Sequence, residues 1–192
     1  MTDGDWRAPS GHRTHSVPRR PPPPAGMSTL DLLWAHEQIR DLAHRYALAV
    51  NMRDLDALVE LFVDDVRGFG GRTGREALKE VFRANISVDV DVLEVTTQVV
   101  NLVDADHATG TVYSRCEMGS RDTWARQSIA YEDRYERRAG SWLFVDRKHL
   151  LFYGVEVPER PLDQPAAEWP AHVLGRGSVP YDWPSWQAAR RS

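Results

Sequence analysis

The sequence predicts an α+β domain in which three helices precede a four-stranded antiparallel sheet and pack on one of its faces. Two observations predict this class. The stretch from Met27 to Val157 has 131 residues without proline and lies between two proline-rich flanks, which indicates one folded body. Within it, apolar residues recur every three or four positions up to Asn85 and at every second position afterwards.

Helical periodicity begins at Thr29, and its apolar stripe consists of Leu32, Ile39, Leu42, Ala43, Tyr46, Ala47 and Val50. Asp54 has the position of an N-cap for a second helix, which we expect to bury Leu55, Leu58, Val59 and Phe62. Thr73 and Glu76 have the spacing of a capping box, which predicts the start of a third helix there.

Strand periodicity first shows clearly near Val95, where alternation continues to Val103. Polar turn residues at 104–107 separate this strand from a second one near 108–118. A third strand is predicted near 125–137 and a fourth near 141–153, joined by a hairpin turn. The sequence therefore predicts an antiparallel meander.

Composition excludes several classes of protein. The chain has 192 residues, of which 42% are hydrophobic and 27% are charged, as in globular domains. The net charge of −4 argues against a nucleic-acid-binding surface. Cys116 is the single cysteine, which excludes an internal disulfide and a thiolate-rich metal site. We expect a cytoplasmic protein with no metal, no cofactor, no nucleic acid and no membrane partner.

The two flanks differ in composition. Residues 1–26 are rich in Pro and Arg and are expected to form a disordered leader, although the run Pro21–Pro24 could dock on a proline-binding module and Met27 could be the native start. Residues 158–192 contain Trp169, Trp183 and Trp186 among six prolines. We expect this strap to lie along the 27–157 body in an extended path, with a flexible tail as the alternative.

Several motifs together resemble a known family. They are Arg45-Tyr46, the run from Asn51 to Asp65, Gly74-Arg75, Thr97 to Asn101, Asp133, Gly140 to Trp142 and Arg147. In this order they resemble SnoaL-like proteins of the nuclear transport factor 2-like superfamily over about residues 29–153. The resemblance implies a curved sheet and helices that form a cone around a deep, mostly apolar pocket. Relatives include polyketide cyclases, ketosteroid isomerases and scytalone dehydratase, but also proteins without catalysis.

The resemblance also implies a general base and its orienting partner, an Asp at the end of the first helix and a His on the following strand. Here these positions are Asn51 and Gln98, and neither amide titrates. We expect both, together with Asn101, to orient a substrate. The alternatives are a helix-end cap for Asn51 and an internal hydrogen bond for Gln98.

Other residues could supply the chemistry. Asp133 shares a predicted strand face with Tyr131, and both are candidate catalytic groups unless Asp133 forms a salt bridge to Arg115 or Arg147. His149 is a candidate general base, with a structural histidine as the alternative. The substrate-binding candidates on other elements are Tyr46, on the apolar stripe, and Arg147, on the last strand.

Two functions remain open at this point. The first is a cofactor-independent isomerase, cyclase or dehydratase that acts on a small hydrophobic polyketide-, steroid- or terpenoid-like molecule. The second is a non-catalytic binding protein or accessory subunit, which the loss of the Asp/His pair favours. The resemblance implies a homodimer in both cases, because members of the superfamily commonly pair sheet against sheet.

Overall fold

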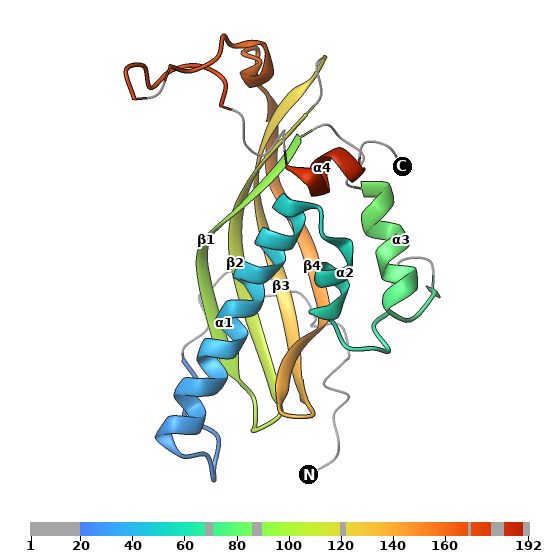
Figure 1. Cartoon of the computed structure of the whole chain (residues 1–192). Coiled ribbons are helices and arrows are strands. Elements are labelled where there is room, and N and C mark those ends of the chain that lie inside the picture. The colour runs from blue at the N-terminus through green and yellow to red at the C-terminus, as the bar shows by residue number, and fades with distance from the viewer. Residues whose placement is uncertain are drawn as a thin grey trace.

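A computed structural model describes residues 20–67, 71–85, 90–119, 122–168, 170–177 and 183–189, and its architecture is the predicted α+β arrangement (Figure 1). Three helices come first, namely α1 (Thr29–Met52), α2 (Leu55–Glu60) and α3 (Arg75–Asn85). The strands follow as β1 (Val90–Leu102), β2 (His107–Gly119), β3 (Trp124–Arg138) and β4 (Ser141–Glu156). They form one antiparallel sheet in the order β1-β2-β3-β4. The helices cover one face of it.

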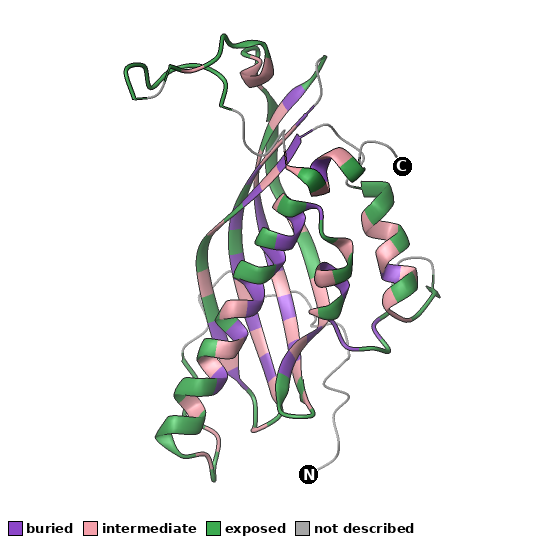
Figure 2. Cartoon of the chain, in the orientation of Figure 1, coloured by how far each residue is buried: buried purple, intermediate pink, exposed green. Residues whose placement is uncertain are grey.

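Helix α1 begins and ends with local signals in the sequence. Ser28 is its N-cap and forms a capping box with Asp31, and Arg53 closes the helix in the left-handed region with a φ of 56°. One side of α1 is buried against the sheet, while the opposite side is exposed (Figure 2). The buried residues are Ala35, Ile39, Leu42, Ala43, Tyr46, Ala47, Ala49 and Val50. The predicted apolar stripe is therefore the packing face of α1.

The other helices also follow the sequence closely. Asp54 caps α2, and its carboxylate accepts a hydrogen bond from the backbone N–H of Ala57 at 3.0 Å. Helix α3 begins at Arg75, directly after Gly74, whose φ of +97° favours glycine. The helix start is thus one residue beyond the position that a cap at Thr73 would give.

Strand β1 begins at Val90, five residues before the predicted start at Val95. Both faces of the strand are covered over its first residues. Val90 packs with Trp124 and Trp186 in a small cluster, whereas Asp91 and Leu93 are buried on the side of the helices. A strand that is buried on both faces shows no apolar–polar alternation, which hides it from sequence analysis. An irregularity between Val95 and Thr97 further shifts the pattern.

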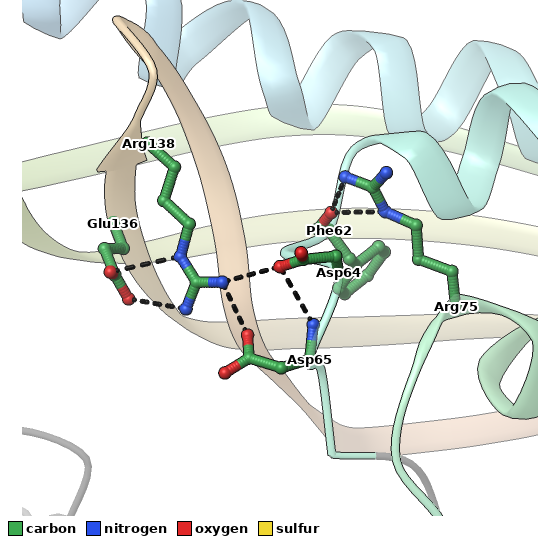
Figure 3. Close-up of polar contacts among 6 residues, drawn as sticks. All are labelled: Phe62, Asp64, Asp65, Arg75, Glu136 and Arg138. Carbon is green, nitrogen blue, oxygen red and sulfur yellow. Dashed lines mark hydrogen bonds and ion pairs between the residues drawn. The ribbon is translucent and has the colours of Figure 1, made fainter.

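The β3–β4 hairpin is tied to the segment after α2 (Figure 3). The guanidinium of Arg138 donates to Asp64 at 2.7 Å and to Asp65 at 2.6 Å, and it also holds Glu136 on its own strand. Arg75 donates two hydrogen bonds, at 2.9 and 2.6 Å, to the carbonyl of Phe62. These contacts fix the segment that carries Phe62, a residue in the wall of the cavity described below.

The C-terminal segment touches the body at its two ends. After β4 it forms a short 3-10 helix, η2 (Pro161–Asp163), and then loops away from the sheet (Figure 2). Val173 and Leu174 in this loop are 74% and 78% exposed. The chain returns as α4 (Pro184–Ala189), which lies near the end of α1 and the start of β1 (Figure 1). The sequence predicted an extended path along the body. The structure differs, because the segment loops away from the sheet and ends in the helix α4.

Trp186 anchors α4 on the body. Its ring is 1% exposed, its indole N–H donates to the backbone carbonyl of Asn51, and the guanidinium of Arg53 lies 4.6 Å from the ring centroid. Trp183 is partly buried in the same cluster. Trp169 and residues 1–19 of the predicted leader lie outside the described residues.

Candidate functional site

A cavity of about 880 Å³ lies between the concave face of the sheet and the helices. Its apolar walls come from every layer of the fold, and include Val50, Phe62, Leu78, Phe82, Leu93 and Ile129. Its polar groups are concentrated on the sheet. Those used below are Tyr46, Asp91, Cys116, Gln127, Tyr131, Arg147 and His149. Such a cavity suits a small molecule with an apolar body and a few polar atoms.

Arg147 is a buried cation in the wall of this cavity. Its side chain is 3% exposed, and its Nε lies 3.3 Å from the Oδ1 of Asp133. Its guanidinium carbon also lies 4.2 Å from the ring centroid of Tyr46 and 4.0 Å from that of Tyr131. An ion pair and stacked aromatic faces together stabilise a charge that is largely removed from water.

Asp133 lies behind Arg147. Its side chain is completely buried, and the hydroxyl of Tyr135 donates to its Oδ2 at 2.8 Å. Gly110, opposite Asp133 on β2, leaves room for this contact, because a Cβ there would come within 2.9 Å of the Tyr135 hydroxyl. Among the described residues, Asp133 does not line the cavity. The salt bridge considered as its alternative role is present, and its catalytic role stays a prediction.

Tyr46 and Tyr131 line the cavity, and their hydroxyl groups are neutral hydrogen-bond donors. Their rings meet edge to face with centroids 5.8 Å apart. Burial raises the pKa of Tyr46 to about 12 and raises the pKa of Tyr131 well above its usual value. The nearby charge of Asp91 contributes to both increases, while that of Arg147 opposes them. Both tyrosines are thus in the cavity wall, and their catalytic and substrate-binding roles stay predictions.

Asp91 is a carboxylate in the cavity wall that sequence reasoning missed. The residue is 8% exposed, and its Oδ1 accepts a hydrogen bond from the thiol of Cys116 at 3.1 Å. Burial raises the pKa of Asp91, against the lowering effects of the Cys116 hydrogen bond and of the positive charge on Arg53. Burial and the adjacent Asp91 also raise the pKa of Cys116 far above that of a free thiol. The thiol is therefore a donor here and not a nucleophile.

His149 lies at the edge of the cavity. Its residue is exposed, and its ring packs against Tyr131 with centroids 5.7 Å apart. Partial burial lowers its pKa, so the imidazole is mainly neutral at pH 7 and can accept a proton. The structure thus brings three of the predicted site residues on the sheet together, namely Tyr131, Arg147 and His149.

Asn51 and Gln98 make contacts within the protein. The amide of Asn51 donates to the carbonyl of Leu93 at 3.0 Å and accepts from its N–H at 2.7 Å. Gln98 donates to the carbonyl of Ile39 at 3.4 Å. Asn101 pairs with Thr109 further along β1. In the described part of the chain none of these three amides lines the cavity, and their substrate-binding roles stay predictions.

In the described ranges, no three His, Cys, Asp or Glu side chains gather closely enough to hold a metal ion. The helices within those ranges are also too short or too polar to cross a bilayer.

Comparison with known proteins decides the family. The model of the SnoaL-like domain matches residues 31–148, which is more than half of the chain. The chain belongs to the SnoaL-like family. No curated protein matches its sequence.

Solved structures similar to this SnoaL-like protein share its fold. Hexachlorocyclohexane dehydrochlorinase LinA-type3 from Novosphingobium barchaimii is 22% identical, with a TM-score of 0.63 over 69% of this chain and 97% of that one. A Novosphingobium aromaticivorans protein provisionally named a scytalone dehydratase is 18% identical, with a TM-score of 0.60 over 69% and 94% of the two chains. A Mycobacterium tuberculosis protein of unknown function is 26% identical, with a TM-score of 0.55 over 66% and 77%. The helices and curved antiparallel sheet described above are therefore the nuclear transport factor 2-like fold.

Proposed function

We propose that this SnoaL-like protein is a cofactor-independent enzyme of the isomerase or lyase type that acts on a small, neutral, hydrophobic molecule in the cone cavity. The observation that carries the proposal is the composition of the 880 Å³ cavity, in which apolar walls surround two un-ionised tyrosine hydroxyls and a buried cation. Family membership and the fold of the dehydrochlorinase and dehydratase neighbours support the same class.

The polar groups suit a reaction in which an oxygen gains negative charge. Tyr131 and Tyr46 can donate hydrogen bonds to such an oxygen, and Arg147 stacked on their rings adds a positive charge nearby. The Arg147 charge is largely balanced by Asp133, so the cavity favours a neutral substrate over an anion. Enolates and related oxyanions form in isomerisation, cyclisation and elimination, which are the reaction types proposed here.

Mass spectrometry of compounds that co-purify with the full chain tests this proposal. An apolar, uncharged compound in one-to-one amount supports it. As a control, Ile129→Trp narrows the cavity from β3 and should purify without the compound. A charged ligand, or a compound that Ile129→Trp retains, would contradict the proposed site.

A binding or accessory-subunit function is the second candidate. One observation favours it: the positions of the family's acid–base pair carry amides.

For either function, the outer face of the sheet exposes Val99, Tyr113, Phe152 and Val155. Tyr113 and Phe152 pack on each other there, with ring centroids 5.5 Å apart. We propose that this face pairs with a second copy of the chain. Light scattering should give the mass of a dimer, and Tyr113→Lys should give a monomer. A monomeric wild type contradicts the pairing.

A further inference from the structure

We propose that Asp91 is the proton-transferring residue of the cavity, that it acts on a carbon atom next to a substrate carbonyl group, and that Cys116 is its positioning residue. This inference rests on the proposed function, because it assumes that the cavity binds a hydrophobic substrate. The proposed acid–base group therefore lies at the beginning of β1. The end of α1, where the family resemblance implies this group, carries Asn51 instead.

The geometry of two neighbouring strands places Asp91 and Cys116 together. Asp91 lies opposite Met118 and Leu93 opposite Cys116 in the antiparallel register, so Asp91 and Cys116 are diagonal neighbours on the concave face. All four residues line the cavity. The thiol donates to Oδ1 of Asp91, and within the described residues Oδ2 takes part in no hydrogen bond. One carboxylate oxygen is held and the other is available to a ligand.

The surroundings of Asp91 differ from those of the other carboxylate in the wall. Asp146 forms an ion pair with Arg134 at 2.9 Å, whereas Asp91 forms none with any residue that the structure describes. The thiol of Cys116 and the guanidinium of Arg53 lower the pKa of Asp91, and the charge of Asp91 in turn raises the pKa of Tyr46 and of Tyr131. A carboxylate that is buried, without an ion pair and open to a cavity is well suited to exchange a proton.

Asn51 supports this arrangement without taking part in chemistry. Its amide holds the N–H and the carbonyl of Leu93, two residues along β1 from Asp91. Its backbone carbonyl also accepts the indole N–H of Trp186, whose ring lies against Arg53. The end of α1 therefore positions the beginning of β1 and the cation that faces Asp91.

The proposed step conserves atoms and charge. The Asp91 carboxylate takes a proton from a carbon next to the carbonyl, and the C–H electron pair forms the C=C bond of an enolate. The negative charge moves to the carbonyl oxygen, to which Tyr131 or Tyr46 donates a hydrogen bond. The Asp91 carboxylic acid then returns a proton to carbon. No electrons leave the pair of reactants, so the step requires no oxidant or cofactor.

Hydrogen–deuterium exchange of 2-tetralone tests the inference, because this apolar ketone has acidic hydrogens next to its carbonyl group. The full chain in D₂O should bind 2-tetralone and accelerate the exchange over buffer, as followed by proton NMR. Asp91→Asn should bind the ketone and lose about 100-fold of the acceleration. Asp163→Asn, the same change at an exposed carboxylate in η2, should keep the wild-type rate. Circular dichroism verifies that each variant is folded, and Asp91→Glu, which keeps a carboxylate, should retain part of the acceleration.

The outcomes separate the two proposals. If the wild type does not bind 2-tetralone, the proposed function is contradicted. If it binds the ketone but exchange is not accelerated, or if Asp91→Asn keeps the acceleration, the inference on Asp91 is overturned while the cavity's binding role stands.

The pH dependence of the exchange tests Cys116 as the positioning residue. Its hydrogen bond lowers the pKa of Asp91, so Cys116→Ala should move the acidic limb of the rate profile, where Asp91 loses its proton, to higher pH. Cys116→Ser keeps a donor and should restore the wild-type profile. A uniform loss of rate in both variants, without a shift along the pH axis, would contradict the positioning role.

Discussion

Two buried carboxylates on the same concave sheet face have opposite surroundings. Asp133 on β3 contacts the buried cation of Arg147 and accepts a hydrogen bond from Tyr135. Asp91 on β1 accepts a hydrogen bond from a thiol, and burial raises its pKa. A carboxylate paired with a buried cation behind the cavity wall has a structural role, whereas one without an ion pair in the wall is available for proton transfer. The difference shows that burial of a carboxylate alone does not identify a catalytic group.

The largest expected effect on stability comes from removing the cation that pairs with Asp133. Arg147→Met keeps the approximate volume but leaves the Asp133 carboxylate buried without its cation. We expect a loss of about 3–5 kcal/mol in the free energy of unfolding, measured by urea denaturation. The double variant Arg147→Met/Asp133→Asn should recover a large part of this lost stability, because no buried charge is then left unpaired.

Lys148→Met serves as the matched control for Arg147→Met, since this neighbouring side chain is 64% exposed. It should change stability by less than about 0.5 kcal/mol. A loss below about 1 kcal/mol in Arg147→Met would mean that the ion pair with Asp133 is not structural.

A smaller effect is expected at the contact between the C-terminal segment and the beginning of β1. Trp186→Phe keeps an aromatic ring against Arg53 but removes the N–H that donates to the Asn51 carbonyl. The expected loss is about 1 kcal/mol in the free energy of unfolding. Leu174→Ser in the exposed loop should leave stability unchanged. Equal losses in both variants would contradict the view that α4 anchors the segment and the loop does not.

A third effect on stability depends on pH. Because burial raises the pKa of Asp91 in the folded protein, its ionisation disfavours folding at neutral pH. Asp91→Asn should therefore gain stability relative to wild type above the raised pKa, by about 1.4 kcal/mol for each unit of that increase. The gain should vanish as the pH falls to about 4, where the unfolded chain also becomes protonated. Urea denaturation at several pH values measures it, and a gain that is independent of pH would contradict this origin.

The same comparison explains how far the sequence could predict the site. The face shared by Tyr131, Asp133 and Tyr135 was evident from period-two spacing on one strand. The family resemblance, in turn, directed attention to Asn51 and Gln98. Which arginine would pair with Asp133 depended on the register between β3 and β4, which spacing alone leaves open.

Asp91 was missed for a different reason. It lies in a strand end that is covered on one face by Trp186 and Trp124, from distant parts of the chain, and on the other by the cavity. Its thiol donor, Cys116, is 25 residues away, and as the single cysteine it indicated only that a disulfide and a thiolate-rich metal site are excluded. Contacts between distant parts of the chain leave no local periodicity, so the sequence alone gives only a weak indication that Asp91 is buried at a cavity.

Titration of Asp91 in the folded protein tests the account most directly. The side-chain carboxyl carbons of aspartate residues can be followed by ¹³C NMR as the pH changes, and the signal of Asp91 is assigned as the one missing in Asp91→Asn. We predict a midpoint above the ordinary aspartate value of 3.8, which moves higher still in Cys116→Ala. A midpoint at or below 3.8 in the wild type would contradict the assignment of Asp91 as the proton-transferring group.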